Sequence, residues 1–230
     1  MKKLLLLFTA LLVLNSAISQ VRFGIKAGIN SANLSDVEMT ISNRTIIMYE
    51  QDKPLIGFHA GAFVNVSFGN IIGFQPELLL SMQGGNQKIN PSVPKLDPQI
   101  PDDLKYCYQF TYLQVPLLLE LKPIPILKLG ILVGPQFGVN LSKKATETYS
   151  VFKKTVSGSA FDKEYGNGFK NLNTSMVFGL QYTILKLNVG ARYNLGLNNC
   201  LDADMREGFV TANMRGWKQN VLQVNLGLLF

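Results

Sequence analysis

The sequence predicts an all-β fold: an eight-stranded antiparallel up-and-down transmembrane β-barrel. Three observations predict it. Apolar and polar residues alternate along almost every apolar segment after residue 20. The connections between these segments are alternately short and long. Acidic residues are confined to the long connections, apart from two that lie on the polar faces of their segments.

The amino terminus has the features of a secretory signal peptide. Lys2 and Lys3 precede an apolar run over residues 4–14, and small residues follow up to Ser19. The run is shorter than the roughly 18 residues that a membrane-spanning helix needs. We therefore expect residues 1–19 to be a signal peptide and residues 20–230 to form the outer-membrane barrel domain.

Each predicted strand has one apolar face and one polar or glycine-rich face. In the first strand, Val21 and Phe23 share the apolar face while Lys26 lies on the other. Most of the strands are long enough to cross a bilayer at the usual tilt. The predicted strands span residues 21–29, 58–68, 74–82, 113–121, 127–141, 176–182, 187–195 and 222–230.

The connections predict which end of the barrel faces the cell exterior. Short turns are expected at residues 69–70, 123–125 and 183–184, and long loops at residues 34–53, 84–105, 142–171 and 198–217. Outer-membrane barrels have short periplasmic turns and long extracellular loops. We expect the long segments outside the cell and the short turns in the periplasm.

The charge distribution indicates a membrane barrel. All but two of the 15 acidic residues lie in the long connections, and Glu77 and Glu120 lie on polar faces. A charge facing lipid near the bilayer midplane costs about 2–4 kcal/mol. A soluble periplasmic ligand-binding barrel would have the opposite pattern, and we keep it as an alternative. The net charge of +7 comes from scattered lysines, so we expect no nucleic acid partner.

The inward-facing charges are expected to neutralise one another. A turn centred near residue 124 would place Glu120 opposite Lys128. Glu77 falls opposite Phe63 and requires a cation from across the lumen, either Lys26 or Arg192. The predicted interior charge network consists of Lys26, Glu77, Glu120, Lys128 and Arg192.

Candidate catalytic and metal-binding residues are few. His59 is the single histidine, and Ser67 on the same face lies roughly 26 Å along the strand, too far for a base and its nucleophile. We expect no catalysis, with a lipid-modifying outer-membrane enzyme as the alternative. Cys107 and Cys200 give no metal-ligand spacing and no essential disulfide. We expect no cofactor, no metal and, with eight strands, no conducting pore.

Aromatic residues near the strand ends predict a girdle at the membrane interface. Tyr106, Tyr108 and Tyr112 lie near the outer end of one strand, where a ligand platform is the alternative. The same interpretation applies to Tyr182, Tyr193 and Trp217. Aromatic girdles at both interfaces are typical of outer-membrane barrels.

Five segments resemble a known family. They are GIKAGINSANLS, YLQVPLLLE, GPQFGVNLS, NVGARYNLGLNN and NVLQVNLGLLF. From about residue 22 to residue 230 the chain resembles the PorT-like outer-membrane β-barrel family of Bacteroidota. The resemblance implies an eight-stranded barrel in the outer membrane and a terminal aromatic assembly signal, here Phe230, for the barrel-assembly machinery. Where many relatives carry an acidic residue, this chain has Gln114.

The namesake of that family belongs to a system that exports proteins across the outer membrane. Membership implies only the barrel, and we expect a structural, surface-binding or secretion-accessory role exerted through the long outer loops. The expected partners are outer-membrane lipid, the barrel-assembly machinery during insertion, and a possible envelope or secretion partner.

Overall fold

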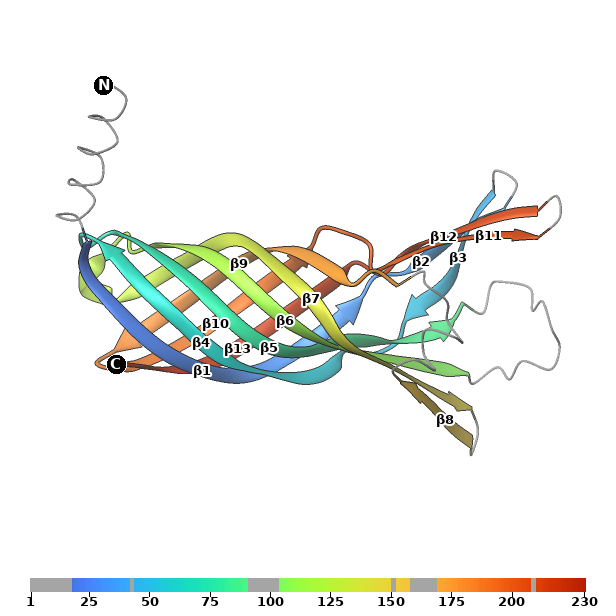
Figure 1. Cartoon of the computed structure of the whole chain (residues 1–230), viewed down its shortest axis with the longest axis horizontal. Helices are drawn as coiled ribbons and strands as arrows, with labels where there is room; N and C mark the ends of the chain where they lie inside the picture. Colours follow the sequence, from blue (N-terminus) through green and yellow to red (C-terminus); the bar gives the residue numbers. More distant parts are fainter. Residues whose placement is uncertain (1–17, 42–43, 91–103, 150–151, 158–168, 208–209) are drawn as a thin grey trace, which may run out of the picture.

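The structure is a computed structural model that describes residues 18–41, 44–90, 104–149, 152–157, 169–207 and 210–230. Tilted strands form a long barrel, and β-hairpins project from one of its ends (Figure 1). None of the described residues belongs to a helix long and apolar enough to cross a membrane.

Eight strands close the barrel. Each pairs antiparallel with the next, and the last of them pairs with the first. This closure confirms the predicted eight-stranded antiparallel barrel. The strands are β1 (Ile18–Leu34), β4 (Leu55–Phe68), β5 (Ile72–Ile89), β6 (Lys105–Leu121), β7 (Leu129–Tyr149), β9 (Leu172–Ile184), β10 (Leu187–Gly196) and β13 (Gln219–Leu229).

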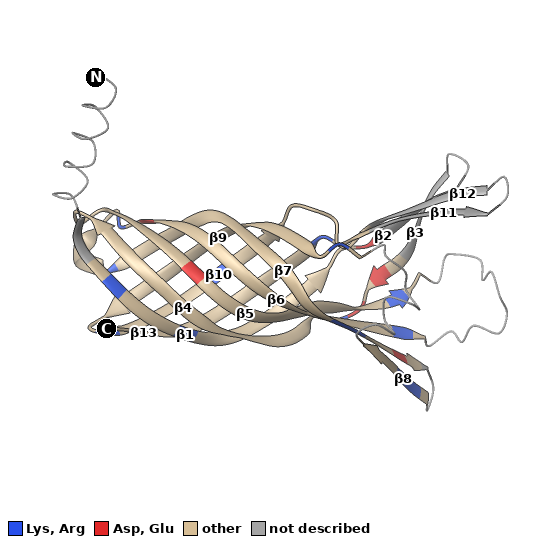
Figure 2. Ribbon diagram, viewed as in Figure 1, with Lys and Arg blue, Asp and Glu red and all other residues tan. Residues whose placement is uncertain are grey.

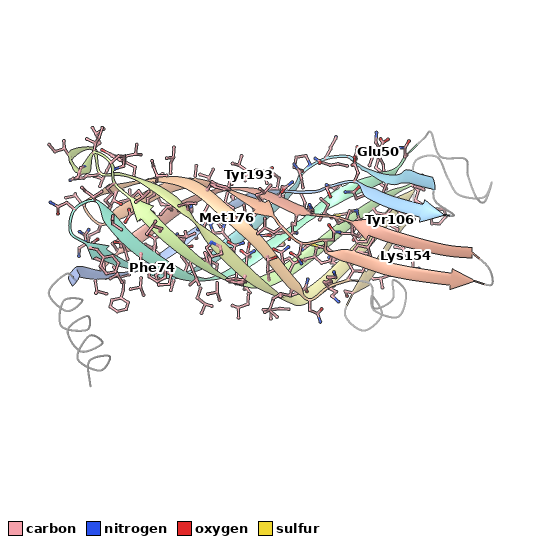
Figure 3. All side chains as sticks on the ribbon, turned by 90° about the horizontal axis from the view of Figure 1, so that it is seen from above. Glu50, Phe74, Tyr106, Lys154, Met176 and Tyr193 are labelled. Carbon is pink, nitrogen blue, oxygen red and sulfur yellow. The ribbon has the colours of Figure 1, made fainter. Side chains whose placement is uncertain are left out.

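The barrel is apolar outside and polar inside. Phe23 and Phe58 are 62% and 64% exposed. Polar residues of opposite parity on the same two strands, such as Lys26 and His59, point inward and are buried. Side chains such as Phe74, Met176 and Tyr193 cover the outer wall (Figure 3). Charged residues gather toward the ends of the barrel, and few lie along the wall between (Figure 2). Alternation along each strand therefore separates a lipid-facing surface from a polar lumen.

The segments predicted as long loops contain further strands. These are β2 (Val37–Ile41), β3 (Arg44–Gln51), β8 (Phe152–Ser157), β11 (Leu201–Glu207) and β12 (Val210–Gly216). The β2–β3 and β11–β12 hairpins join through β12 and β2, and β3 pairs with the end of β5. Backbone ladders can continue beyond the membrane span without alternating side chains, so periodicity did not reveal these extensions.

The opposite end, here called the turn end, carries the short connections. Gly69 has φ 66° between β4 and β5, and Leu185 has φ 54° between β9 and β10. The third turn contains the short 3₁₀ helix η1 (Pro125–Leu127), and Lys128 ends it with φ 53°.

The predicted register of β6 against β7 is wrong. The 3₁₀ turn lengthens the connection, so Glu120 pairs with Leu132 rather than with Lys128. Lys128 is an exposed residue of the turn itself. Pro123 and Pro125 explain the difference, because proline cannot donate to a ladder and Pro125 instead begins the 3₁₀ helix.

Candidate functional site

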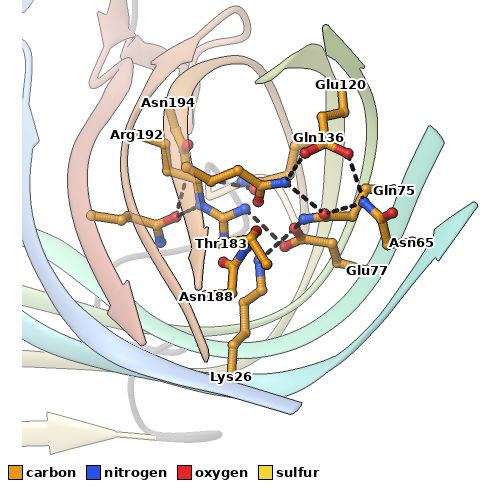
Figure 4. Close-up of polar contacts among 12 residues, drawn as sticks. Lys26, Asn65, Gln75, Glu77, Glu120, Gln136, Thr183, Asn188, Arg192 and Asn194 are labelled. Atoms are coloured by element: carbon orange, nitrogen blue, oxygen red, sulfur yellow. Dashed lines mark hydrogen bonds and ion pairs between the residues drawn. The ribbon is translucent and has the colours of Figure 1, made fainter. Parts of the chain in front are cut away.

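A buried charge cluster lies in the middle of the lumen. Lys26 Nζ is 2.6 Å from Glu77 Oε1, and Arg192 Nη1 is 2.8 Å from Glu77 Oε2. All three side chains are at most 1% exposed. Lys26 also lies 4.7 Å from the ring centroid of Phe63, the residue that pairs with Glu77 across β4 and β5. Both cations that the sequence suggested as alternatives, Lys26 and Arg192, therefore contact the carboxylate of Glu77 (Figure 4).

Glu120 has a separate set of partners nearer the turn end. Asn65 donates to its Oε2 at 2.8 Å, Gln181 donates to its Oε1 at 2.5 Å, and Lys122 Nζ lies 2.9 Å from Oε2. The cation next to Glu120 is therefore Lys122 and not the predicted Lys128. A Cβ at Gly130 would lie only 2.6 Å from Glu120 Oε1, so this glycine leaves the room that the carboxylate occupies.

Amide side chains connect the two carboxylates and continue the network outward. Gln75 donates to Glu77 at 2.8 Å and accepts from Asn65 and Gln181. On the other side of the cluster, Arg192 Nε donates to Gln223 Oε1 at 2.7 Å, and Gln223 donates to Asn30 at 2.9 Å. Sequence reasoning named the charges and missed these amides, although their alternation places them on the same inward faces.

His59 is held in this network. The amide nitrogen of Asn30 donates to the carbonyls of Phe58 and Met82, so its Oδ1 is the acceptor for His59 Nδ1 at 2.7 Å. Ser81 lies directly opposite His59 in the ladder of β4 and β5. Both residues are described and no hydrogen bond joins them; Ser81 Oγ accepts from Asn30 and Gln83 instead.

An aromatic cluster, here called the outer cap, lies toward the hairpin end of the barrel. The ring of Trp217 lies 4.4 Å from that of Tyr108 and 5.3 Å from that of Phe169, and Phe110 lies 5.9 Å from Phe169. These four side chains are at most 7% exposed.

The prediction of an interfacial girdle is wrong for part of this set. Tyr108 and Tyr112 lie on the inward face of β6, and Trp217 is also buried. Tyr108 and Tyr112 have the same parity as the lumen-facing Gln114 on the same strand. Alternation in the sequence could therefore have predicted that both tyrosines point inward. Tyr182 and Tyr193 do face outward and are each 43% exposed.

A cavity of about 520 Å³ opens at the turn end. Glu120 and the amides around it form its inner wall. Arg22, Lys122 and Lys128 line it, together with Ile126 and Leu185 from two of the turns. Sequence reasoning did not foresee this cavity, which depends on the three-dimensional arrangement of the turns.

The described cysteines and acids do not group into a metal site. Among the described residues, no three His, Cys, Asp or Glu side chains are grouped to hold an ion. Cys107 and Cys200 are both free thiols. Cys200 belongs to the same buried cluster as the outer cap. Burial raises its pKa to about 11, and burial also raises the pKa of Cys107.

A closed antiparallel barrel with an apolar exterior, a polar interior and short turns at one end defines the class of transmembrane β-barrels. Residues 15–202 match the model of the outer membrane protein beta-barrel domain family, and the chain belongs to that family. It is therefore an outer-membrane protein. No curated protein matches the sequence.

Several solved structures are similar. Ail, the attachment invasion locus protein of Yersinia pestis, is 12% identical, with 92% of this chain and 99% of that chain covered and a TM-score of 0.40. OprG from Pseudomonas aeruginosa is 12% identical, with coverages of 91% and 95% and a TM-score of 0.44. CarO of Acinetobacter baumannii is 10% identical, with coverages of 89% and 97% and a TM-score of 0.41.

Proposed function

We propose that this protein is a sealed, non-catalytic outer-membrane barrel that acts through the hairpins at its outer end, in a structural, surface-binding or secretion-accessory role. The observation that carries the proposal is the buried polar network in the lumen. The network from Glu120 to Gln83 crosses the barrel, and the outer cap lies above it. A barrel sealed in this way would act through the paired hairpins of β2, β3, β11 and β12.

A conductance measurement tests the sealed lumen. The purified protein is reconstituted into planar lipid bilayers, with a large-pore porin as the positive control. We expect no current steps above the lipid background, because the polar side chains are fixed by hydrogen bonds to one another. Regular ion-conducting steps would overturn the proposal.

The absence of catalysis is part of the proposal. Ser81 is 0% exposed and His59 is 2% exposed, so neither side chain is accessible to a lipid substrate, and Ser81 has no hydrogen bond to a base. Replacing His59 by Asn and Ser81 by Ala in separate strains is expected to leave the acyl composition of lipid A unchanged by mass spectrometry. A loss of one acyl species in both strains would instead support the lipid-modifying alternative.

We further propose that the protein is a PorT-like barrel from Bacteroidota, exported by its signal peptide and inserted by the barrel-assembly machinery. The family match supports the barrel, and the five resembling segments support the narrower assignment. Deleting the gene and comparing the proteins in the medium tests a role in secretion. We expect wild-type protein to restore any lost cargo and a variant with both hairpins shortened to fail.

A further inference from the structure

The outer end of β7 and the short strand β8 form a hairpin that projects beyond the barrel wall and carries basic residues (Figure 2). Among the described strands, β8 pairs only with β7. This hairpin is therefore separate from the paired hairpins of β2, β3, β11 and β12, on which the proposed function depends.

Packing determines which face of the β7–β8 hairpin points away from the barrel. Ala145 and Val156 are partners in its ladder, are 1% and 7% exposed, and belong to the same buried cluster as the outer cap. Successive residues of a strand point to opposite faces, so the residues next to this pair face outward. This outward side, here called the basic face, consists of Lys144, Thr146, Thr148, Lys153, Thr155 and Ser157.

The two lysines of the basic face have no anionic partner. Lys144 and Lys153 are exposed, and neither forms an ion pair with another residue in the described part of the chain. Glu147, the one acidic residue in the described part of the hairpin, lies on the opposite side, toward the outer cap. On the neighbouring strand β6, Lys105 lies opposite a residue of the basic face and is paired with Asp52 at 3.3 Å. Lys144 and Lys153 therefore give this face an uncompensated positive charge.

These two charges converge above a pair of hydroxyl groups. Burial raises the pKa of the Cys107 thiol, and the charges of Lys144 and Lys153 oppose that rise, so both ammonium groups act on this one thiol from different strands. Cys107 lies opposite Thr146 in the ladder, and Thr146 Oγ1 is 3.3 Å from Thr155 Oγ1. Two ammonium groups with hydroxyl donors between them are complementary to a phosphate group.

The basic face begins just beyond the lipid-facing wall. Val139 and Leu141 on β7 are 51% and 57% exposed and belong to the apolar exterior of the barrel. Lys144 is three residues further along the strand, which is about 10 Å, and the strand tilt makes its height above the wall smaller. A lysine side chain also extends its charge toward the membrane interface. At this height the charged headgroup of a lipid lies beside the hairpin, and basic residues attract anionic lipids there.

We propose that the basic face binds the phosphate groups of a phosphorylated glycolipid in the outer leaflet of the outer membrane. Lys144 and Lys153 neutralise the phosphate, the threonine hydroxyls between them donate hydrogen bonds, and the acyl chains lie against Val139 and Leu141. The proposal depends on the predicted topology, which places this end of the barrel at the cell surface. It does not depend on a role for the paired hairpins or on a sealed lumen, so the conductance test and the following test can fail independently.

Native mass spectrometry of the mature protein in a non-ionic detergent tests this proposal. The probe is purified diphosphoryl lipid A, and the fraction of protein with bound lipid gives Kd. We expect Lys144→Gln/Lys153→Gln to raise Kd at least about tenfold, because each lysine next to an anionic lipid strengthens binding about fivefold. Removal of the phosphates from lipid A is expected to weaken its binding to the wild-type protein by a similar factor. Lys144→Arg/Lys153→Arg keeps both charges and should retain binding.

The matched control is Lys128→Gln/Lys186→Gln, which removes two exposed lysines at the turn end and should leave Kd unchanged. Heat-modifiable electrophoretic mobility verifies that each variant is folded. Equal Kd values for the two double glutamine variants, equal binding of lipid A with and without phosphates, or no saturable binding would overturn the proposal. Displacement of lipid A by inorganic phosphate at equal concentration would overturn the assignment to a lipid and favour a soluble anion.

Discussion

Replacing Glu77 by glutamine is expected to destabilise the barrel far more than removing Lys26. Glu77 makes two charge-assisted contacts, at 2.6 and 2.8 Å, each worth about 1.5–3 kcal/mol. Glu77→Gln leaves two buried cations without a counter-ion, and we expect the free energy of unfolding to fall by about 3–5 kcal/mol. Lys26→Met leaves the pair of Glu77 and Arg192 intact. It also removes the repulsion between two buried like charges, which offsets most of the lost contact, so we expect a cost of about 1 kcal/mol or less.

The assay is urea unfolding of the protein in lipid vesicles, followed by electrophoretic mobility and by fluorescence of Trp217. Glu50→Gln is the control, because it removes a partly exposed carboxylate 3.8 Å from Lys88, and such pairs contribute at most about 1 kcal/mol. In the double variant Glu77→Gln/Lys26→Met, the two losses should not add. Once Lys26 is removed, Glu77 has only its contact with Arg192 left to lose. Equal costs for Glu77→Gln and Lys26→Met would refute the shared-carboxylate arrangement.

Three further predictions follow from the packing and the termini. Gly130→Ala should lower the free energy of unfolding by about 1–3 kcal/mol in the same assay, because the new methyl would force Glu120 from its place; an unchanged midpoint would contradict this. Cys107 and Cys200 should react with maleimide at pH 7.5 more slowly than an exposed cysteine, because burial raises both pKa values and the thiolate is the reactive form. Reduction should leave the heat-modifiable mobility unchanged, and its loss would reveal an essential disulfide. Phe230→Ser should reduce the amount of inserted barrel in cells but not refolding in detergent, and equal amounts in cells would argue against an assembly signal.

Alternation along the sequence was sufficient to predict the barrel because lipid and lumen make opposite demands on successive residues. Ile25 and Lys26 are adjacent in the chain, and the first is 54% exposed whereas the second is 4% exposed. The same rule placed Glu77 opposite Phe63, which the ladder of β4 and β5 confirms. Whether a residue has an odd or even place along its strand therefore predicted which side chains face lipid and most of those that face the lumen.

Details that depend on turn geometry were not predictable in this way. Both Glu120 and Lys128 have the inward parity, but the 3₁₀ helix after Pro123 takes Lys128 out of the ladder and shifts the partner of Glu120 to Leu132. The outer hairpins were missed for a different reason. Outside the membrane, backbone hydrogen bonds extend strands whatever their side-chain pattern, so the extension of β5 to Ile89 left no periodic trace.

The most direct test of the central claim, a closed outer-membrane barrel with its hairpins outside the cell, is site-directed labelling of intact cells with a membrane-impermeant maleimide. In a background lacking both native cysteines, Lys153→Cys on β8 and Lys186→Cys in the turn between β9 and β10 report on the two ends. We expect Lys153→Cys to be labelled in intact cells and Lys186→Cys only after the outer membrane is permeabilised. Labelling of Lys186→Cys alone in intact cells, or recovery of the protein in the soluble periplasm, would contradict the account.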